Sequence, residues 1–351
     1  MKIALVSDIH FGCRGDSLVF LDYTKKFIDK VFFPALEKHG VKGNDIIIAG
    51  DLVDRRKYIN FNTAVRIQDD FLSKLKGAWV LPGNHDCYHK DNNEVNALEV
   101  LCRDPKFIVV DEPCEYRHED GTSILMVPWI SPENQERVME AIQKSTADIC
   151  IGHFELQGFT MYPGMVCSHG MSPSVLSKFK LVVSGHFHST SRKGNVLYLG
   201  SPLQITWNDY GDPRGFYILD TCTFELNYIQ NPIEMFHKVV YDDTDKSMEQ
   251  VLAWDFDKFQ DAFVKVIVRR KTNPYWFDLF IEKLDIVATD VKVVEDLIDK
   301  PEEEMNLIEG CEDTTTILRK YVRKSEAGVN KDNLENLIVS LYNEAIQMGV
   351  Q

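Results

Sequence analysis

Five short segments between residues 7 and 188 carry the side chains best suited to chemistry. They are SDIHFG (7–12), GDLVD (50–54), GNHD (83–86), GHFE (152–155) and GHFH (185–188). Their Asp, Asn and His side chains offer oxygen and nitrogen ligands without thiolate, a set that suits Mn²⁺, Fe²⁺ or Mg²⁺ better than a structural zinc ion. Two such ions that share a carboxylate are a standard device for hydrolysing phosphate esters. The segments therefore predict a two-metal centre.

Seven side chains in these segments have the type and spacing of metal ligands. Residues two apart on an extended chain point to the same face, which pairs Asp8 with His10 and His186 with His188. The order of the segments makes Asp51 the candidate for a carboxylate that bridges two ions. The predicted ligands are Asp8, His10, Asp51, Asn84, His153, His186 and His188.

His85 lies next to a predicted ligand, Asn84, but cannot easily share its direction. It suits a proton donor to the leaving oxygen, with Asp86 available to orient its imidazole. The basic residues Arg55 and Arg56 directly follow the second segment, where they would touch substrate phosphates; a solvated loop is the alternative. The roles of Asp54 and His169 stay open at this stage.

Short apolar runs of strand type precede most of these segments, and strands deliver their last residues to one edge of a sheet. Ligands far apart in sequence can therefore converge. Up to about residue 190, strand-like runs alternate with helical patterns. The expected strands are 2–7, 45–49, 78–81 and 148–152, and the expected helices are 18–38, 61–75 and 134–145. Short strands of period two follow residue 194. The pattern predicts a sandwich of two sheets with helices outside.

The sequence predicts four parts. Residues 1–232 carry all five segments. Residues 233–300 are predicted to form a small α/β unit, with a helix over 248–263. Residues 301–315 are acidic and punctuated by Pro and Gly, as in a linker. Residues 316–351 hold two helices, of which the second places Leu334, Leu337, Ile338, Leu341 and Ala345 on one face. That face would dock on a partner or pack on the protein's own body.

The composition bounds the function further. The 351-residue chain has a net charge of −15, which taken alone argues against nucleic acid as a ligand, although the acidic excess is concentrated after residue 230. Eight cysteines show no metal-finger spacing and indicate free thiols in a reducing compartment. No signal peptide and no apolar stretch of about 18 residues is found, so we expect a soluble intracellular protein without a membrane span.

The five segments, in this order, resemble those of calcineurin-like metallophosphoesterases. Two later segments, GSPLQITWND (200–209) and DPRGFYILD (212–220), resemble the SbcD/Mre family of DNA-repair nuclease subunits. The stretch GHFELQGF…SHGM (152–171), together with Pro128–Trp129, is most similar to the shorter phage-type members.

This resemblance implies a four-layer αββα sandwich over 1–232, a capping domain over 233–300 and partner-docking helices over 316–351. It implies the seven ligands above, a catalytic histidine at His85, and two Mn²⁺ ions per subunit, with Mg²⁺ as an alternative. The implied activity is exonuclease action on duplex DNA and endonuclease action on single strands, together with an SbcC-like ABC ATPase in DNA repair and recombination. The implied location is the cytoplasm, or the host cytoplasm if a phage encodes the chain.

The resemblance also implies a homodimer that pairs near the N-terminal helices. The apolar residues there exceed what one helix face needs, so that some would meet a second copy, with core packing as the alternative. These residues are Leu18, Phe20, Leu21, Phe27, Val31 and Phe32.

Two other readings remain. A phosphoesterase acting on a small molecule or a phosphoprotein would use the same centre, but it would not need residues 236–351. A scaffold that only binds partners could lose ligands, and here none is missing.

Overall fold

The computed structural model describes residues 1–118, 120–162 and 165–295, and in the C-terminal segment Val322, Lys331, Leu334, Leu337 and Ile338. It divides into two compact units. The first comprises Met1–Ile205 and Gly211–Met235, and the second comprises Thr206–Tyr210 and the described residues from Phe236 onward. The assignment of Thr206–Tyr210 to the second unit is not evident from the sequence.

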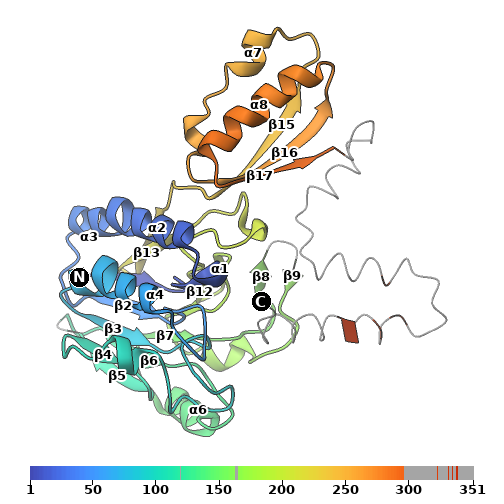
Figure 1. Cartoon of the computed structure of the whole chain (residues 1–351). Coiled ribbons are helices and arrows are strands. Elements are labelled where there is room, and N and C mark those ends of the chain that lie inside the picture. Colours follow the sequence, from blue (N-terminus) through green and yellow to red (C-terminus); the bar gives the residue numbers. More distant parts are fainter. Residues whose placement is uncertain are drawn as a thin grey trace. The chain divides into compact units, whose positions relative to one another are not determined.

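The first unit contains two six-stranded sheets, shown in Figure 1. One has the strand order β14-β13-β1-β2-β3-β4, and β1 to β4 run parallel while β13 is antiparallel to both of its neighbours. Its strands are β1 (Lys2–Val6), β2 (Ile46–Ala49), β3 (Ala78–Leu81), β4 (Phe107–Val109), β13 (Gly215–Asp220) and β14 (Glu225–Gln230).

The other sheet has the order β11-β12-β10-β7-β6-β5, in which β6, β7, β10 and β12 are parallel. Its strands are β5 (Cys114–Arg117), β6 (Ser123–Val127), β7 (Ile149–His153), β10 (Leu181–Gly185), β11 (Ser191–Lys193) and β12 (Val196–Tyr198). Between β7 and β10 the chain forms a separate hairpin of β8 (Thr160–Tyr162) and β9 (Met165–Val166).

The two sheets pack face to face through aliphatic side chains. Leu5, Ile47 and Leu81 of the first sheet share one buried cluster with Ile149 and Val183 of the second. Each fully buried aliphatic side chain of this kind contributes about 1.5–3 kcal/mol through removal from water. The predicted two-sheet sandwich is confirmed, and its rigid core holds the strand ends in place.

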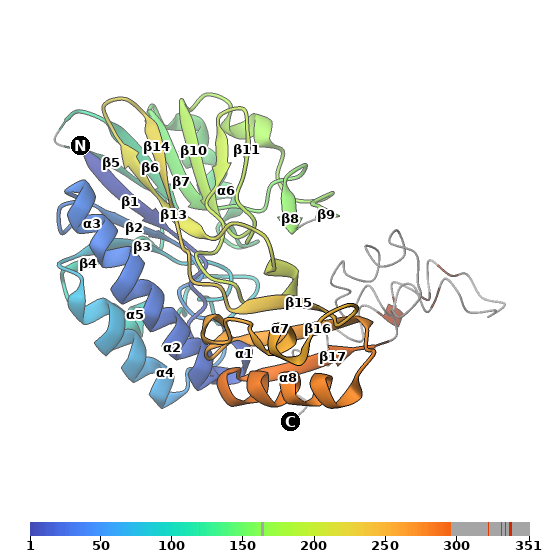
Figure 2. The same ribbon diagram turned by 90° about the horizontal axis from the view of Figure 1, so that it is seen from above.

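Helices cover the outer faces of the sandwich, as Figure 2 shows. A continuous helical stretch is made of α2 (Leu18–Phe27), a π-helical turn (Ile28–Phe32) and α3 (Phe33–His39), and it follows a short α1 (Cys13–Asp16). The others are α4 (Phe61–Arg66), extended by π-helical and 3₁₀ turns to Lys74, α5 (Leu98–Leu101) and α6 (Gln135–Lys144). These bounds agree with the three helices expected from the sequence.

The aromatic residues of the first helices are core residues. Phe27 and Phe32 both contact Phe216 of β13, with ring centroids 6.1 and 5.0 Å apart. Of the six residues considered for dimer contact, the four that are buried are Phe20, Leu21, Phe27 and Phe32. These four residues are core residues, as in the alternative interpretation, so that only Leu18 and Val31 of this set stay available for contact with a second copy. Leu18 is exposed and Val31 is half-buried.

The second unit is a parallel three-stranded sheet with helices packed on one face. Its order is β15-β16-β17, and its elements are β15 (Phe236–Asp242), α7 (Met248–Leu252), β16 (Phe263–Arg270), α8 (Pro274–Val287) and β17 (Asp290–Val294). Phe280 of α8 is fully buried in a core cluster that also contains Val264 and Val266 of β16.

The helix expected over 248–263 ends at Leu252 and is followed only by a 3₁₀ turn at Asp257–Phe259. Trp254 and Phe256 both contact the Phe280 ring, with centroid distances of 5.7 and 5.6 Å. Residues two apart on an α-helix do not face the same side. Packing both aromatic rings on Phe280 therefore excludes a continuous helix.

Part of the C-terminal prediction lies outside the described residues, including the linker 301–315 and the residues Leu341 and Ala345. Leu334, Leu337 and Ile338 are helical, and Leu337 is exposed. Within the described ranges, every helix is too short or too polar to cross a membrane. The seven cysteines in those ranges are all free, and five of them are buried, as expected.

Candidate metal centre

The predicted ligands come from the carboxyl ends of five strands, three in the first sheet and two in the second. Asp8 and His10 follow β1, Asp51 follows β2, Asn84 follows β3, His153 ends β7, and His186 and His188 follow β10. Parallel strands present these ends at one edge, so residues 180 positions apart meet. Five of the seven side chains are buried, and those of His186 and His188 are half-buried.

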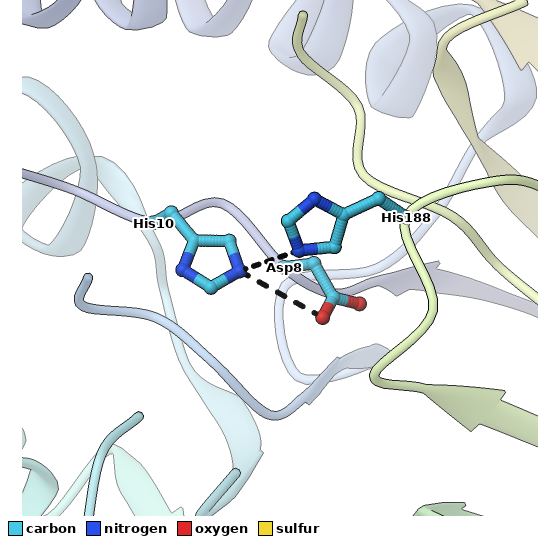
Figure 3. Close-up of side chains that lie close together, drawn as sticks. All are labelled: Asp8, His10 and His188. Atoms are coloured by element: carbon cyan, nitrogen blue, oxygen red, sulfur yellow. Dashed lines mark hydrogen bonds and ion pairs between the residues drawn. The ribbon is translucent and has the colours of Figure 1, made fainter. Parts of the chain in front are cut away.

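One cluster joins Asp8, His10 and His188, whose ligand atoms all lie within 4.8 Å of one another. Figure 3 shows the two imidazole rings turned toward each other, with His10 Nε2 3.0 Å from His188 Nε2. The same His10 atom lies 4.0 Å from Asp8 Oδ1. Three donors thus converge on one small volume.

A second cluster joins Asp51, His153 and His186. Asp51 Oδ2 lies 3.3 Å from His153 Nε2, and it also lies 3.7 Å from His10 Nε2 of the first cluster. Asn84 Oδ1 is 2.9 Å from His186 Nδ1 and 3.1 Å from His153 Nε2. One oxygen of Asp51 therefore lies between the two clusters, the position required of a bridging carboxylate.

Backbone strain is concentrated at these residues. Asp8, His10, Asp51 and His186 have φ angles of 53°, 52°, 52° and 91°, in the left-handed region. Such conformations cost about 1–2 kcal/mol for residues other than glycine. Hydrogen bonds between the strand-end loops hold them, including Asp8 N–H to the Gly50 carbonyl at 3.0 Å and His10 N–H to the Asp51 carbonyl at 3.1 Å.

Two glycines allow the loops to approach closely. A Cβ at Gly50, which has a φ of 94°, would lie 2.2 Å from His153 Nδ1, and one at Gly83 would lie 2.3 Å from Asp51 Oδ1. Both contacts are far shorter than a carbon atom tolerates. The glycines that precede Asp51 and Asn84 in the sequence thus serve the same centre as the ligands, and a glycine directly before a ligand is a sequence signal of such close packing.

His85 is oriented by a backbone carbonyl. Its Nδ1 lies 2.6 Å from the Asp54 carbonyl oxygen, which assigns the proton to Nδ1 and leaves Nε2 as the free ring nitrogen. Its backbone N–H donates to Asp51 Oδ1 at 2.7 Å. His85 is therefore held to the second segment at two points: its ring by the Asp54 carbonyl, and its backbone N–H by one oxygen of Asp51, the candidate bridging carboxylate.

The prediction that Asp86 orients His85 is wrong. Both Asp86 oxygens accept backbone N–H groups, from Val53 at 3.1 Å and from Gly83 at 2.8 Å. Burial, together with the nearby charge of Asp51, raises the pKa of Asp86 to about 7. Asp86 therefore ties two strand-end loops together beneath the site.

Electrostatics favour neutral imidazoles at two of the candidate ligands. Burial, reinforced by His188 and His85, lowers the pKa of His10 well below its usual value. Burial and His153 lower the pKa of His186 to about 3. Burial opposes ionisation of both Asp51 and His153, but their mutual contact outweighs it: the pKa of Asp51 lies well below its usual range, and that of His153 is raised to about 9. A metal ion at this pair would displace the proton that His153 holds. Neutral imidazoles and an ionised carboxylate are the forms that bind metal ions.

The donor set fits divalent cations. His10 Nδ1 is buried without a hydrogen bond, while the facing Nε2 atoms of His10 and His188 can share at most one proton. His153 Nδ1 lies 2.8 Å from the Ala49 carbonyl, so that its Nε2 points at Asp51 and Asn84. A histidine that donates one ring N–H to a carbonyl and directs the other nitrogen inward is typical of metal sites.

Two supporting residues were not assigned a role from the sequence. Trp129 lies against His186 and His153, with ring centroids 5.1 and 5.9 Å apart. Arg214 is buried and donates to the His188 carbonyl and, at 2.9 Å, to Asp212 Oδ2. Both occur in segments noted above only for their resemblance to a nuclease family.

The basic residues beside the second segment are partly engaged. Arg55 pairs with Asp16 at 3.1 Å and donates to the Tyr58 hydroxyl at 2.7 Å. Arg56 is half-buried. His169 forms a group with Glu155 and Cys167 rather than with the seven candidate ligands.

Comparisons with known proteins show what this chain is similar to. The family model described as calcineurin-like phosphoesterase matches residues 1–190. Over 99% of its length the chain is 31% identical to a protein named exonuclease subunit 1 of Enterobacteria phage T4, of which it covers 100%. A solved archaeal phosphodiesterase, at 15% identity and a TM-score of 0.34, covers 66% of this chain with 100% of its own; this likeness is too low to carry an argument.

Proposed function

The chain belongs to the calcineurin-like phosphoesterase family, and from this premise we propose that it is the nuclease subunit of a DNA-processing assembly. It hydrolyses phosphodiester bonds with two Mn²⁺ ions per subunit, for which Mg²⁺ is the alternative. The observation that carries the proposal is the pair of buried clusters that share Asp51.

The two clusters would each hold one ion. Asp8, His10 and His188 would bind the first, and Asn84, His153 and His186 the second, with Asp51 between them. Divalent cations bound there would neutralise the phosphate charge and lower the pKa of a bound water. The protein's own contribution is to fix these donors before the substrate arrives, through a backbone that is already strained into place.

His85 would act as the proton donor to the leaving oxygen. The Asp54 carbonyl fixes the ring by holding Nδ1–H, so that Nε2 is the atom able to carry a proton to the substrate. Arg55 and Arg56, on the loop that follows Asp51, would contact phosphates further along the strand.

DNA as the substrate is supported by the full-length similarity to the phage exonuclease subunit. We propose exonuclease action on duplex ends and endonuclease action on single strands, in repair and recombination, inside the cell. The word subunit in that relative's name supports a multi-subunit assembly, and for this chain we propose an SbcC-like ABC ATPase as the partner. Residues 233–300 would act as the capping domain.

We propose that the C-terminal helix grips the ATPase through Leu334, Leu337, Ile338 and Leu341. Removal of residues 313–351 should leave Mn²⁺-dependent cleavage of short DNA by the isolated subunit intact. The same removal should abolish ATPase binding and ATP-stimulated processing. A truncated protein that still co-purifies fully with the ATPase would contradict the docking role.

A homodimer is part of the proposal, and we propose that its interface is formed by the exposed apolar residues of α2 and α4. On α2 and α4 the exposed fractions of Leu18, Phe61 and Val65 are 61%, 91% and 54%. The two helices are joined by an ion pair at 2.8 Å between Asp22 and Arg66. Their exposed apolar residues are candidates for contact with a second copy.

The competing function is hydrolysis of a small phosphate ester or a phosphoprotein. The purified protein, incubated with Mn²⁺, should cleave duplex DNA ends far faster than a generic aryl phosphodiester or phosphomonoester. Comparable rates on all of these substrates, or a preference for the phosphomonoester, would refute the nuclease proposal. An Asp51→Asn variant purified in parallel controls for contaminating nucleases.

A further inference from the structure

A third group of potential ligands lies outside the centre described above. It comprises Glu155, Cys167 and His169, whose ligand atoms lie within 4.8 Å of one another. His169 Nε2 is 2.8 Å from Glu155 Oε1, and Cys167 Sγ donates to the His169 carbonyl at 3.1 Å. None of the three belongs to the seven candidate ligands of the two-metal centre.

The backbone around this group is fixed by hydrogen bonds. Glu155 follows β7, and its carbonyl accepts the Met171 N–H at 2.8 Å. On the other side, the Cys167 N–H donates to the Phe159 carbonyl at 2.8 Å, and the Cys167 carbonyl accepts the Gly158 N–H at 2.7 Å. The loop before β8 and the loop after β9 are thereby held side by side, which brings the three ligand types together before any ion binds.

The chemistry of the group differs from that of the first two clusters. A thiolate, an imidazole and a carboxylate together are a zinc-type donor set, whereas the two-metal centre has no sulfur. In a tetrahedral zinc site, oxygen and nitrogen ligands lie about 3.3 Å apart, given bond lengths of about 2.0 Å. The present distance of 2.8 Å between His169 Nε2 and Glu155 Oε1 therefore needs to open by only about half an ångström.

The exposure of the group indicates what kind of site it is. Cys167 is buried within the core cluster that contains Phe159 and Leu156, while the side chains of Glu155 and His169 are 31% and 67% exposed. One ligand is thus anchored in the core and two reach the surface. A fourth coordination position would open to water.

We propose that Glu155, Cys167 and His169 form a third cation site, selective for Zn²⁺, which ties together the two ends of the β8–β9 hairpin. On binding, the Cys167 thiol releases its proton to solvent, and His169 contributes one ring nitrogen. Its three ligands are distinct from the seven of the two-metal centre, and the proposal does not rest on the proposed nuclease function.

Cobalt substitution provides the test, because only a thiolate ligand gives Co²⁺ a sulfur charge-transfer absorption in the near ultraviolet. The full-length protein, reduced with a phosphine and freed of metal, is titrated with Co²⁺ and then with Zn²⁺. We expect the band to appear with Co²⁺ and to be displaced by Zn²⁺. Ions at the seven nuclease ligands cannot produce it, so this result is separate from any test of nuclease activity.

Variants of the protein show which residues bind the Co²⁺ ion that gives rise to the absorption band. Cys167→Ser should abolish it, and His169→Ala should weaken Co²⁺ affinity by roughly tenfold or more. Cys114→Ser is the matched control, because Cys114 is a free thiol on β5 that belongs to no ligand group, and it should leave the band unchanged. His169 is largely exposed, so its replacement tests the site without endangering the core.

The opposite results would overturn the proposal. No sulfur band in the parent protein would mean that the group is only a Glu–His pair beside an unreactive thiol. A band that survives in Cys167→Ser, or an affinity unchanged in His169→Ala, would equally contradict the assignment.

Discussion

The edge of the sandwich that gathers the metal-seeking residues and the outer face of α2 and α4 both reverse the usual placement of side chains. At the edge, Asp8, Asp51 and His153 are almost fully buried, although charged groups are normally exposed. On the helices, Leu18 and Phe61 are exposed, although large apolar groups are normally buried. Neither arrangement serves the stability of the chain. The comparison shows that a buried cluster of polar side chains indicates a catalytic or metal-binding site, whereas exposed apolar side chains indicate a surface that binds another protein chain.

The largest effect should come from Asp51→Asn. Both clusters share this carboxylate, so the rate of DNA hydrolysis should fall on the order of 10⁴-fold or more, since several kcal/mol of charge stabilisation would be lost. The fold should remain intact, because Asp51 is not part of the aliphatic core. Steady-state cleavage assays with Mn²⁺ and circular dichroism measure the two quantities. Near-normal cleavage would remove Asp51 from the bridging position.

His85→Gln should affect the rate without affecting the metal site. Loss of a general acid predicts a decrease of about 10²–10⁴-fold in kcat, while Mn²⁺ stoichiometry and DNA affinity persist. Isothermal titration calorimetry with Mn²⁺ separates the two roles. Loss of one bound ion in this variant would instead make His85 a ligand.

Gly83→Ala tests how closely the edge is packed. The new Cβ would lie 2.3 Å from Asp51 Oδ1, so the carboxylate must move. A displacement of about 1 Å at the reacting groups can cost about 10²-fold in rate. Gly43→Ala is the matched control, since its Cβ would meet the Lys76 side chain at 2.6 Å, away from the centre. Equal rates in the two variants would show that the centre tolerates such a shift.

The smallest effect on catalysis should follow Phe61→Glu. Because Phe61 is 91% exposed, stability should change by no more than about 0.5 kcal/mol. Cleavage of short DNA per chain should stay close to that of the parent protein, while light scattering should show a shift from dimer to monomer. Ile286→Glu is the matched control, because Ile286 is 81% exposed on α8 of the second unit. A dimer that persists in Phe61→Glu would exclude this face as the interface.

The sequence predicted the elements that depend on periodicity. Strand 78–81 was located to the residue, and the helical stretch from Leu18 to His39 nearly so, because alternation and helical spacing report directly on a buried face. The convergence of the strand ends could also be predicted, because the carboxyl ends of parallel strands lie at the same edge of a sheet. These predictions need only the local sequence pattern and this one rule of sheet topology.

The features that could not be predicted depend on contacts between distant residues, which the spacing of residue types along the sequence does not encode. Asp86 is adjacent to His85 in sequence, yet its oxygens bind the backbone of Val53 and Gly83, and a carbonyl of Asp54 orients the histidine instead. Backbone donors and acceptors are present at every residue, so no residue type marks them. Likewise, the burial of Phe27 depended on Phe216, almost 190 residues away.

The position of β13 has a consequence for synthesis. This strand, at Gly215–Asp220, pairs with β1 at the start of the chain and separates it from β14. A nascent chain that has left the ribosome only as far as Gly185 lacks His186 and His188 and cannot complete the first sheet. Such long-range pairing is slow and comes late. Incomplete translation products should therefore lack the metal centre, because its last ligands and the first sheet are complete only when the whole first unit has been made.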